Sequence, residues 1–397
     1  HSLELTGAVR FEEFLNNSSN VVVPRWGVRW QPFDEQLTLR STFGYGFLEP
    51  TLNELFGAPT FILAPTTHNG HFEPETSFEI TSNKNLQPED SRNFTAGLVY
   101  TPKWMPSGQT LTFSADFWDI ERTGVVVVPS AQEVTNRALS DTGTSLTTQP
   151  GEIVQFDPTT GAVNFVKTNY FNNGRQKGRG VDLSLQYQLQ TQFGLFTWLT
   201  RASYLDSFLF QLDGTQKTHE VSGRVNNDPF EGAFFGQVTI GDGWLKWKGD
   251  SSLDWSWHNL DLFVVERYFD GFKEEIFPGD PTREHYIKQR WFTDGQLSYT
   301  LIFTPPVEEK AVAGYSKGGK EVMTGKDGKA IESTAAYSMP CWKTLLNNSK
   351  FSVGCNNIFG EDPPKAFGFG FGNSNNYPGG LYDNLGRFYY LELTKKF

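Results

Sequence analysis

The sequence predicts an all-β protein: an antiparallel up-and-down transmembrane β-barrel with about twelve strands present. Three observations lead to this prediction. Aromatic residues make up 15% of the 397 residues, yet the mean hydropathy is −0.43. Polar and apolar residues alternate along segments of roughly 10 to 14 residues, whereas ordinary strands have about 5 to 6. The connections between these segments also alternate between short and long, as they do in outer-membrane barrels.

Period-two alternation indicates strands whose two faces meet different surroundings. It is clearest from Val181 to Leu189, where every second residue is large and apolar, and around Leu253 to Trp257. We expect strands near residues 2–14, 20–32, 35–47, 91–103, 108–123, 177–190, 194–210, 244–257, 259–270, 286–303, 348–358 and 385–397.

The connections divide into two groups. Short turns are expected near 31–35, 102–108, 191–194 and 258–259, and long loops near 48–90, 124–176, 211–243, 271–285 and 359–384. Short turns of outer-membrane barrels face the periplasm and long loops face the outside. The segment 304–347 is a long connection at a place where the pattern calls for a short turn. Its Lys, Gly and Ser content predicts a mobile periplasmic insertion.

Composition excludes several classes of protein. No segment approaches the ~18 consecutive apolar residues of a transmembrane helix. The 39 Gly and 21 Pro favour strands and turns over a helical bundle. A net charge of −11 argues against nucleic acid as a partner. The two cysteines cannot build a disulfide framework or a metal site alone.

Tyr and Trp lie toward the ends of the expected strands, as the aromatic girdles of membrane barrels do. We expect membrane-girdle positions at Trp26, Trp30, Trp257 and Tyr389, and a C-terminal barrel signal at Phe397. A soluble β-sandwich would alternate too, but its strands would be shorter and its aromatic residues would not gather at strand ends.

Three segments resemble the C-terminal part of a TonB-dependent outer-membrane receptor. They are Thr42–Leu55, which is similar to a strand end of the type S-x-G-F-x-x-P-x-x-x-E-L; Asn85–Ser91, similar to N-x-x-L-x-P-E-x-S; and Asn356–Pro364, similar to N-N-L-F-D-x-x-P. The terminal Phe397 also fits such a barrel.

The resemblance implies the C-terminal part of one receptor barrel over residues 1–397, with the plug and the early strands absent. Family members have 22 strands around an N-terminal plug, so the first strand here would be the eleventh. The chain opens at His1 inside a strand-like pattern, from which we expect the natural start to lie further upstream. A complete twelve-stranded barrel stays open as the alternative.

The resemblance also implies a function. It is the active uptake of a bulky, scarce substrate across the outer membrane of a Gram-negative bacterium, with energy supplied through TonB. A ferric siderophore is the commonest substrate in the family; saccharides and cobalamin stay open. The implied partners are outer-membrane lipid, the TonB complex acting on the absent plug, and the barrel assembly machinery at the C-terminal strand. The alternatives are a passive porin and a soluble aromatic-rich lectin or adhesin.

Candidate site residues lie in the expected extracellular loops. Phe367, Phe369 and Phe371 alternate with glycines ahead of Tyr377, and rings flanked by glycines suit stacking on a ligand. His68 and His71 are weak candidates for a metal site. No Ser/His/Asp arrangement or carboxylate pair stands out, so we expect neither an enzyme nor a cofactor.

Overall fold

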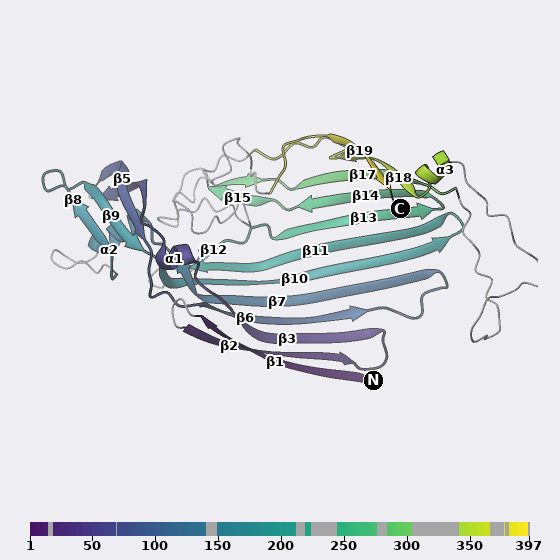
Figure 1. Ribbon diagram of the computed structural model, residues 1–397, viewed down its shortest axis with the longest axis horizontal. Helices are drawn as coiled ribbons and strands as arrows, with labels where there is room; N and C mark the ends of the chain where they lie inside the picture. Colours follow the sequence, from purple (N-terminus) through teal and green to yellow (C-terminus); the bar gives the residue numbers. More distant parts are fainter. Residues whose placement is uncertain are drawn as a thin grey trace, which may run out of the picture.

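The computed structural model describes residues 1–14, 19–68, 70–139, 149–211, 219–223, 244–275, 284–303, 341–365, 377 and 381–395. Twelve strands of this part form one antiparallel sheet in which chain neighbours pair (Figure 1). They are β1 (Ser2–Phe14), β2 (Ser19–Gln31), β3 (Leu37–Leu48), β6 (Glu89–Tyr100), β7 (Gln109–Val127), β10 (Phe171–Thr191), β11 (Gly194–Gln211), β13 (Trp247–Trp257), β14 (Leu260–Phe269), β17 (Arg290–Leu301), β18 (Ser349–Asn356) and β19 (Phe388–Lys395). All twelve predicted strands are therefore confirmed.

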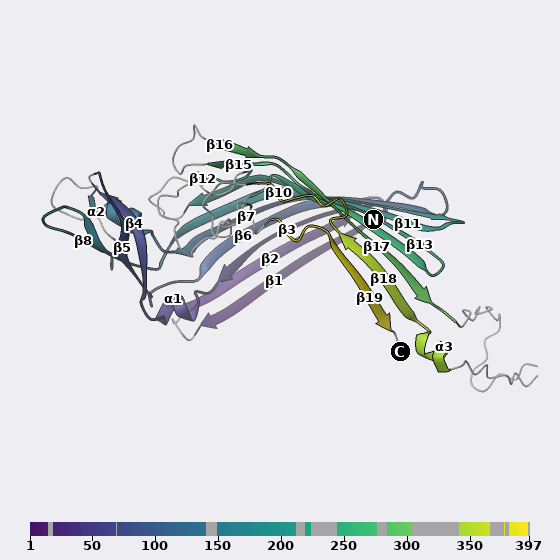
Figure 2. The same ribbon diagram turned by 90° about the horizontal axis from the view of Figure 1, so that it is seen from above.

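The sheet is curved and open, with β1 and β19 as its edges (Figure 2). Most of its short turns lie at one end and most of its long connections at the other (Figure 1). The exceptions are the short β1–β2 connection at the long-loop end and the long β17–β18 connection at the short-turn end. The β10–β11 turn closes through Gly194, whose φ of +110° is a conformation that side chains rarely adopt. The predicted rhythm of short and long connections is thus present.

Two of the long connections fold together into a separate unit, which we call the loop lobe. It contains β4 (Thr60–His68), β5 (His71–Thr81), α2 (Ala131–Leu139), β8 (Ile153–Phe156) and β9 (Val163–Asn169). The short helix α1 (Leu52–Phe56) lies between this unit and the large sheet (Figure 1). The sheet of the loop lobe has the order β4-β5-β9-β8, in which β5 and β9 run parallel. Phe78, Val134 and Val166 are buried in its core, where α2 packs against the sheet. The sequence predicted loops without internal strands here.

Smaller elements border the long-loop end. β12 (His219–Glu220) pairs with β11, and β15 (Phe272–Glu275) pairs with β16 (Glu284–Ile287). At the opposite end, α3 (Cys341–Leu346) immediately precedes β18 and forms the last part of the predicted 304–347 insertion, whose residues 304–340 lie outside the described part (Figure 1). Among the described residues, none of the helices combines the length and apolar character needed to cross a membrane.

Candidate functional site

The large sheet has one apolar face and one polar face. Leu5, Val9 and Leu391 lie on the apolar face, where they are 71%, 71% and 85% exposed. Directly paired residues of neighbouring strands point to the same side, so the register identifies the other face. Arg29 pairs with Arg40, Asp116 with Asp182 and Arg201 with Asp250. We call these the outer face and the inner face, because a barrel in a membrane turns its apolar side toward lipid.

An ion pair on the inner face spans three strands. Arg40 of β3 donates from Nε and Nη2 to the two carboxylate oxygens of Asp116 on β7, at 2.8 and 2.6 Å. Gly97 of β6 lies between them in the register. A Cβ added at Gly97 would lie 2.7 Å from Cγ of Asp116, so the absent side chain lets the pair form.

A groove of 630 Å³ lies along the inner face next to this pair. Its charged lining comes from adjacent strands: Asp116, Asp182, Arg201, Lys248, Asp250 and Arg267. Arg201 contacts Asp250 at 2.9 Å, and Arg267 contacts Asp294 at 2.9 Å. The groove therefore presents both signs of charge, most of them already paired within the sheet.

A second cavity, of 560 Å³, continues toward the long-loop end and shares Asp182, Ser203 and Lys248 with the groove. Trp118, Trp244 and Phe269 line it. The ring of Trp118 lies over the backbone of Gly180, where a Cβ would come within 2.6 Å of Cζ2. Trp244 stacks on Phe208 with centroids 4.1 Å apart. Aromatic walls above a charged floor can hold a ligand that has both ring and polar parts.

The described residues of the C-terminal long loop include three that pack at this end of the sheet: Tyr377, Leu381 and Tyr382. Tyr382 is 4% exposed and packs with Phe272, Ile287 and Phe292, and Tyr377 packs against the same cluster. Burial raises the pKa of the Tyr382 hydroxyl above its ordinary value. That hydroxyl has no hydrogen-bond partner within the described residues. The loop thus places a neutral phenol beside the aromatic cavity.

Of the four predicted substrate-binding residues, the structure describes one. Tyr377 belongs to the aromatic cluster just described, whereas Phe367, Phe369 and Phe371 lie outside the described residues. The cavity walls at Trp118 and Trp244 were missed by the sequence analysis. The sequence signal for Trp118 was Gly180, which is directly opposite it in the register and looks like an ordinary strand glycine in the sequence; Trp244 left no such signal.

The two histidines close the β4–β5 hairpin of the loop lobe. His68 is 9% exposed, its Nδ1 lies 2.7 Å from the carbonyl oxygen of Gly161, and its ring packs on Phe156. His71 is its exposed neighbour in the register. In the part of the chain that the structure describes, no three His, Cys, Asp or Glu residues gather as a metal site would require. His68 therefore serves the packing of the lobe.

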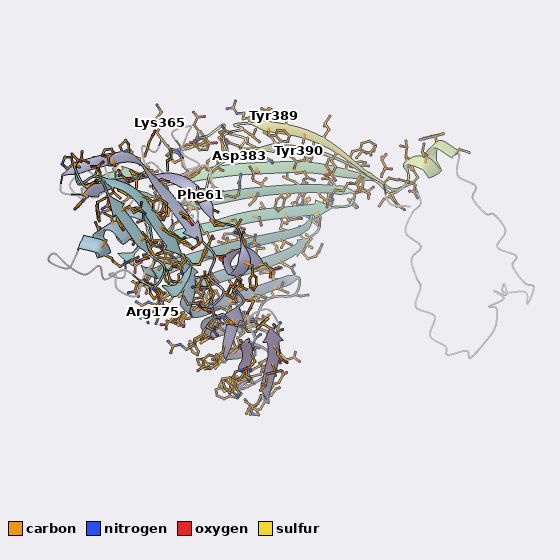
Figure 3. The ribbon with its side chains drawn as sticks, turned by 60° about the vertical axis from the view of Figure 1, so that its left-hand side comes forward. Phe61, Arg175, Lys365, Asp383, Tyr389 and Tyr390 are labelled. Atoms are coloured by element: carbon orange, nitrogen blue, oxygen red, sulfur yellow. The ribbon has the colours of Figure 1, made fainter. Side chains whose placement is uncertain are left out.

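The predicted girdle residues that are described lie on the outer face. Trp30 and Trp257 flank short turns, Trp26 lies further along β2, and Tyr389 is the second residue of β19 at the long-loop end; their exposures are 45%, 40%, 51% and 70%. Phe397 lies outside the described residues. Two further outer-face pairs near the long-loop end, Tyr204–Trp247 and Tyr268–Trp291, have centroids 4.6 and 4.5 Å apart. Figure 3 labels Tyr389 and its chain neighbour Tyr390 on β19; Tyr390 belongs to the inner face, where its hydroxyl donates to Gln296 at 3.0 Å.

Two of the three resemblance motifs, Thr42–Leu55 and Asn85–Ser91, make contacts that order the ends of strands. Thr51 and Glu54 form a capping box at α1, and Leu55 of the same motif is fully buried. Glu89 accepts hydrogen bonds from the backbone N–H of Val126, at 2.8 Å, and from Arg122. These contacts give the motifs a structural role around the long-loop end.

Comparisons with known proteins agree with this geometry. The sequence model of the family described as TonB dependent receptor-like, beta-barrel matches residues 1–310. A search among curated protein sequences finds no significant match.

Solved structures share the fold. The siderophore receptor PirA from Acinetobacter baumannii is 13% identical with a TM-score of 0.55, covering 99% of this chain and 43% of its own. The ferric enterobactin receptor PfeA from Pseudomonas aeruginosa, as a Q482A mutant with enterobactin, is 14% identical with a TM-score of 0.57 and covers 98% and 43%. The FrpB iron transporter from Neisseria meningitidis is 14% identical with a TM-score of 0.51 and covers 98% and 42%.

This chain therefore spans less than half the length of those receptors. Members of the matched family are transport receptors of the Gram-negative outer membrane, not enzymes. The chain forms an amphipathic antiparallel sheet with a polar inner face, and the family model matches most of the chain. The chain therefore belongs to the TonB-dependent receptor β-barrel family and lies in the outer membrane.

Proposed function

We propose that the chain is the C-terminal part of the barrel of a receptor that actively takes up a bulky, scarce substrate with energy supplied through TonB. The observation that carries the proposal is the inner face, where a charged groove of 630 Å³ continues into an aromatic cavity of 560 Å³ within a barrel of this family. The plug on which TonB acts, and the strands that close the barrel between β1 and β19, belong to the remainder of the receptor.

A ferric siderophore is the first substrate to test. The similar solved structures are described as siderophore, ferric enterobactin and iron receptors, which supports this choice. Aromatic walls suit stacking on ring-bearing ligands, and the mixed charges of the floor offer polar contacts. Insertion of the barrel would use the assembly machinery acting on β19.

Uptake by living cells tests the proposal. Cells that lack the gene and carry the full receptor on a plasmid are given radioactive ferric siderophores under iron starvation. We expect saturable uptake that is lost when TonB is deleted, because transport against a gradient needs energy coupling. Passage of a small hydrophilic solute through unrelated porins is the control and should not change with TonB.

A passive channel is the alternative, and the same cells distinguish it. Uptake that stays equal with and without TonB, and that rises linearly with substrate concentration, would favour the channel and exclude the proposed receptor. Saturable, TonB-dependent uptake of a saccharide or of cobalamin would keep the mechanism and replace the siderophore.

A further inference from the structure

A row of polar side chains crosses part of the outer face, where the surrounding positions are apolar. The register places four residues of neighbouring strands directly beside one another: Thr200 of β11, Ser251 of β13, Glu266 of β14 and Thr293 of β17. On β10 the same row continues as Leu185, which is apolar. The polar row is therefore confined to four strands.

Glu266 is the charged member of this row. Among the outward positions that the structure describes on β13, β14 and β17, no other side chain is charged. Glu266 is exposed and makes no hydrogen bond or ion pair with any described residue. The cations of the three strands, Lys248, Arg267 and Arg290, occupy inward positions of the register. The carboxyl group therefore projects outward without a partner among the described residues.

Glu266 lies inside the apolar band of the outer face. The outward positions of β14 from the short turn up to Glu266 are all apolar, and Tyr268 follows it toward the long-loop end. Tyr268 forms one of the outer-face aromatic pairs with Trp291. Two residues at about 3.3 Å each and a tilt of about 40° place Glu266 roughly 5 Å below this pair. In a lone receptor the carboxyl group would face hydrocarbon, where an ionisable group is costly unless it has a partner.

The remainder of a larger barrel would leave this surface open. β13 and β14 lie in the interior of the sheet (Figure 1), whereas further strands would pair with the edges β1 and β19. A plug would lie inside the barrel, against the inner face. Glu266 is therefore accessible only to lipid or to another membrane protein.

Ser251, beside Glu266 in the row, can supply a hydrogen-bond donor to a second molecule. Its Oγ accepts from Nε1 of Trp198 at 2.8 Å and lies 2.8 Å from Oγ1 of Thr200. With Thr200 as the second donor, the hydroxyl of Ser251 keeps its own hydrogen for an acceptor outside the sheet. Gly249, the next outward residue of β13, has no side chain, so another molecule can approach Ser251 closely. The surface thus carries an acceptor on β14 beside a donor on β13.

We propose that two copies of the receptor pair through this surface, and that Glu266 of each copy accepts a hydrogen bond from Ser251 of the other. A two-fold axis along the membrane normal, passing between β13 and β14, exchanges donor and acceptor and keeps both copies upright. Four strands about 4.8 Å apart and an apolar band ~25 Å tall give roughly 500 Å² per copy, about 1,000 Å² in total, which is what a specific interface needs. The inference rests on the outer-membrane location of the chain and does not depend on the proposed transport.

Sedimentation equilibrium of the full receptor in detergent tests the proposal by measuring the dissociation constant of the dimer. We expect the wild type to dimerise. Glu266→Leu should raise the dissociation constant about hundredfold, at roughly tenfold for each of two equivalent contacts. Glu266→Gln keeps an acceptor oxygen and should raise it only about tenfold. A leucine suits a lipid-facing position, so the Glu266→Leu variant should fold.

Ser251→Ala should also weaken the dimer, and adding it to Glu266→Leu should cause no further loss, because the two side chains contact each other. Asp90→Leu is the matched control: it removes an exposed carboxyl group from the outer face of β6, five strands from β14, and should dimerise as the wild type does. A monomeric wild type would overturn the proposal, and so would wild-type dimerisation of Glu266→Leu or additive losses in the double variant. A different protein that copurifies with the wild type but not with Glu266→Leu would also overturn it, since that protein would then occupy the surface.

Discussion

At the scale of single residues, the absent side chain of Gly97 decides a contact between its neighbours. Arg40 and Asp116 are two strands apart, and their ion pair crosses β6 at Gly97. A long basic side chain can cross that distance only over a strand position without a side chain. The same logic applies where Trp118 lies over Gly180.

Gly97→Ala should therefore destabilise the barrel by roughly 1–3 kcal/mol, the usual cost of overpacking. Its Cβ would lie 2.7 Å from Asp116 Cγ and 2.8 Å from the carbonyl oxygen of Ala115, so the ion pair must separate. Gly7→Ala adds the same group on the outer face, where none of the described residues lies within 4 Å of it, and serves as the control. The measurement is urea unfolding of the full receptor, and equal free energies for the two variants would contradict the argument.

At the scale of elements, the short turns are linked to one another. Asp34 in the β2–β3 turn accepts from the backbone N–H of Gln36 at 2.9 Å and from Lys103, in the next short turn, at 3.0 Å. The Gln36 hydrogen bond and then the Lys103 ammonium lower the pKa of Asp34 from 3.8 to about 2. A carboxylate with a lowered pKa stabilises the folded turn when ionised.

The pH dependence follows from that direction. The contribution of Asp34 should be present above about pH 4 and lost as the pH falls toward 2, because the folded turn resists protonation more than the unfolded chain. We expect Asp34→Asn to lower the unfolding midpoint at pH 6 and to match the wild type near pH 2. Glu35→Gln, which removes the adjacent charge, is the control. A difference that persists unchanged at pH 2 would refute this role.

The loop lobe depends on one buried ion pair. Arg137 on α2 contacts Glu152 ahead of β8, and their side chains are 15% and 0% exposed. Arg137→Met would leave the Glu152 carboxylate buried without its cation, at a cost of about 3–5 kcal/mol. Lys167→Met removes a more exposed pair with Glu79 and should cost less than about 1 kcal/mol. Amide hydrogen exchange of β8 and β9 in the full receptor measures the loss of stability in both variants. Equal protection in the two variants would contradict the prediction.

What could be predicted from the sequence differs between the elements. The twelve large strands were predictable because each separates lipid from a polar interior. This contrast produces alternating apolar and polar residues along the strand, as from Val181 to Leu189. The lobe strands were not predictable, because the pairing of Ser77 with Phe165 depends on two loops meeting in space. Charged residues of both signs were expected on the inner face, but the cavity wall at Trp118 depends on Gly180 opposite it and the wall at Trp244 on its stacking with Phe208. Phe367, Phe369 and Phe371 stay a prediction.

At the scale of the whole molecule, the sheet separates three environments with one alternating pattern. The outer face meets lipid, the inner face carries the groove and the cavity, and the long-loop end carries the lobe (Figures 1 and 2). Membership of the receptor family and the outer-membrane location agree with this division. In the receptor that we propose, the remaining strands would join the sheet at its open edges, β1 and β19.

The parallel pairing of β5 with β9 has a consequence for the order of folding. Partners such as Ser77 and Phe165 are separated in the chain by the whole of β6 and β7. Because closing a long loop costs entropy before the new contacts compensate for it, we expect the β5–β9 pairing to form after the β6–β7 hairpin. If so, a probe that binds the folded surface of the lobe would distinguish fully folded chains from chains that are still folding.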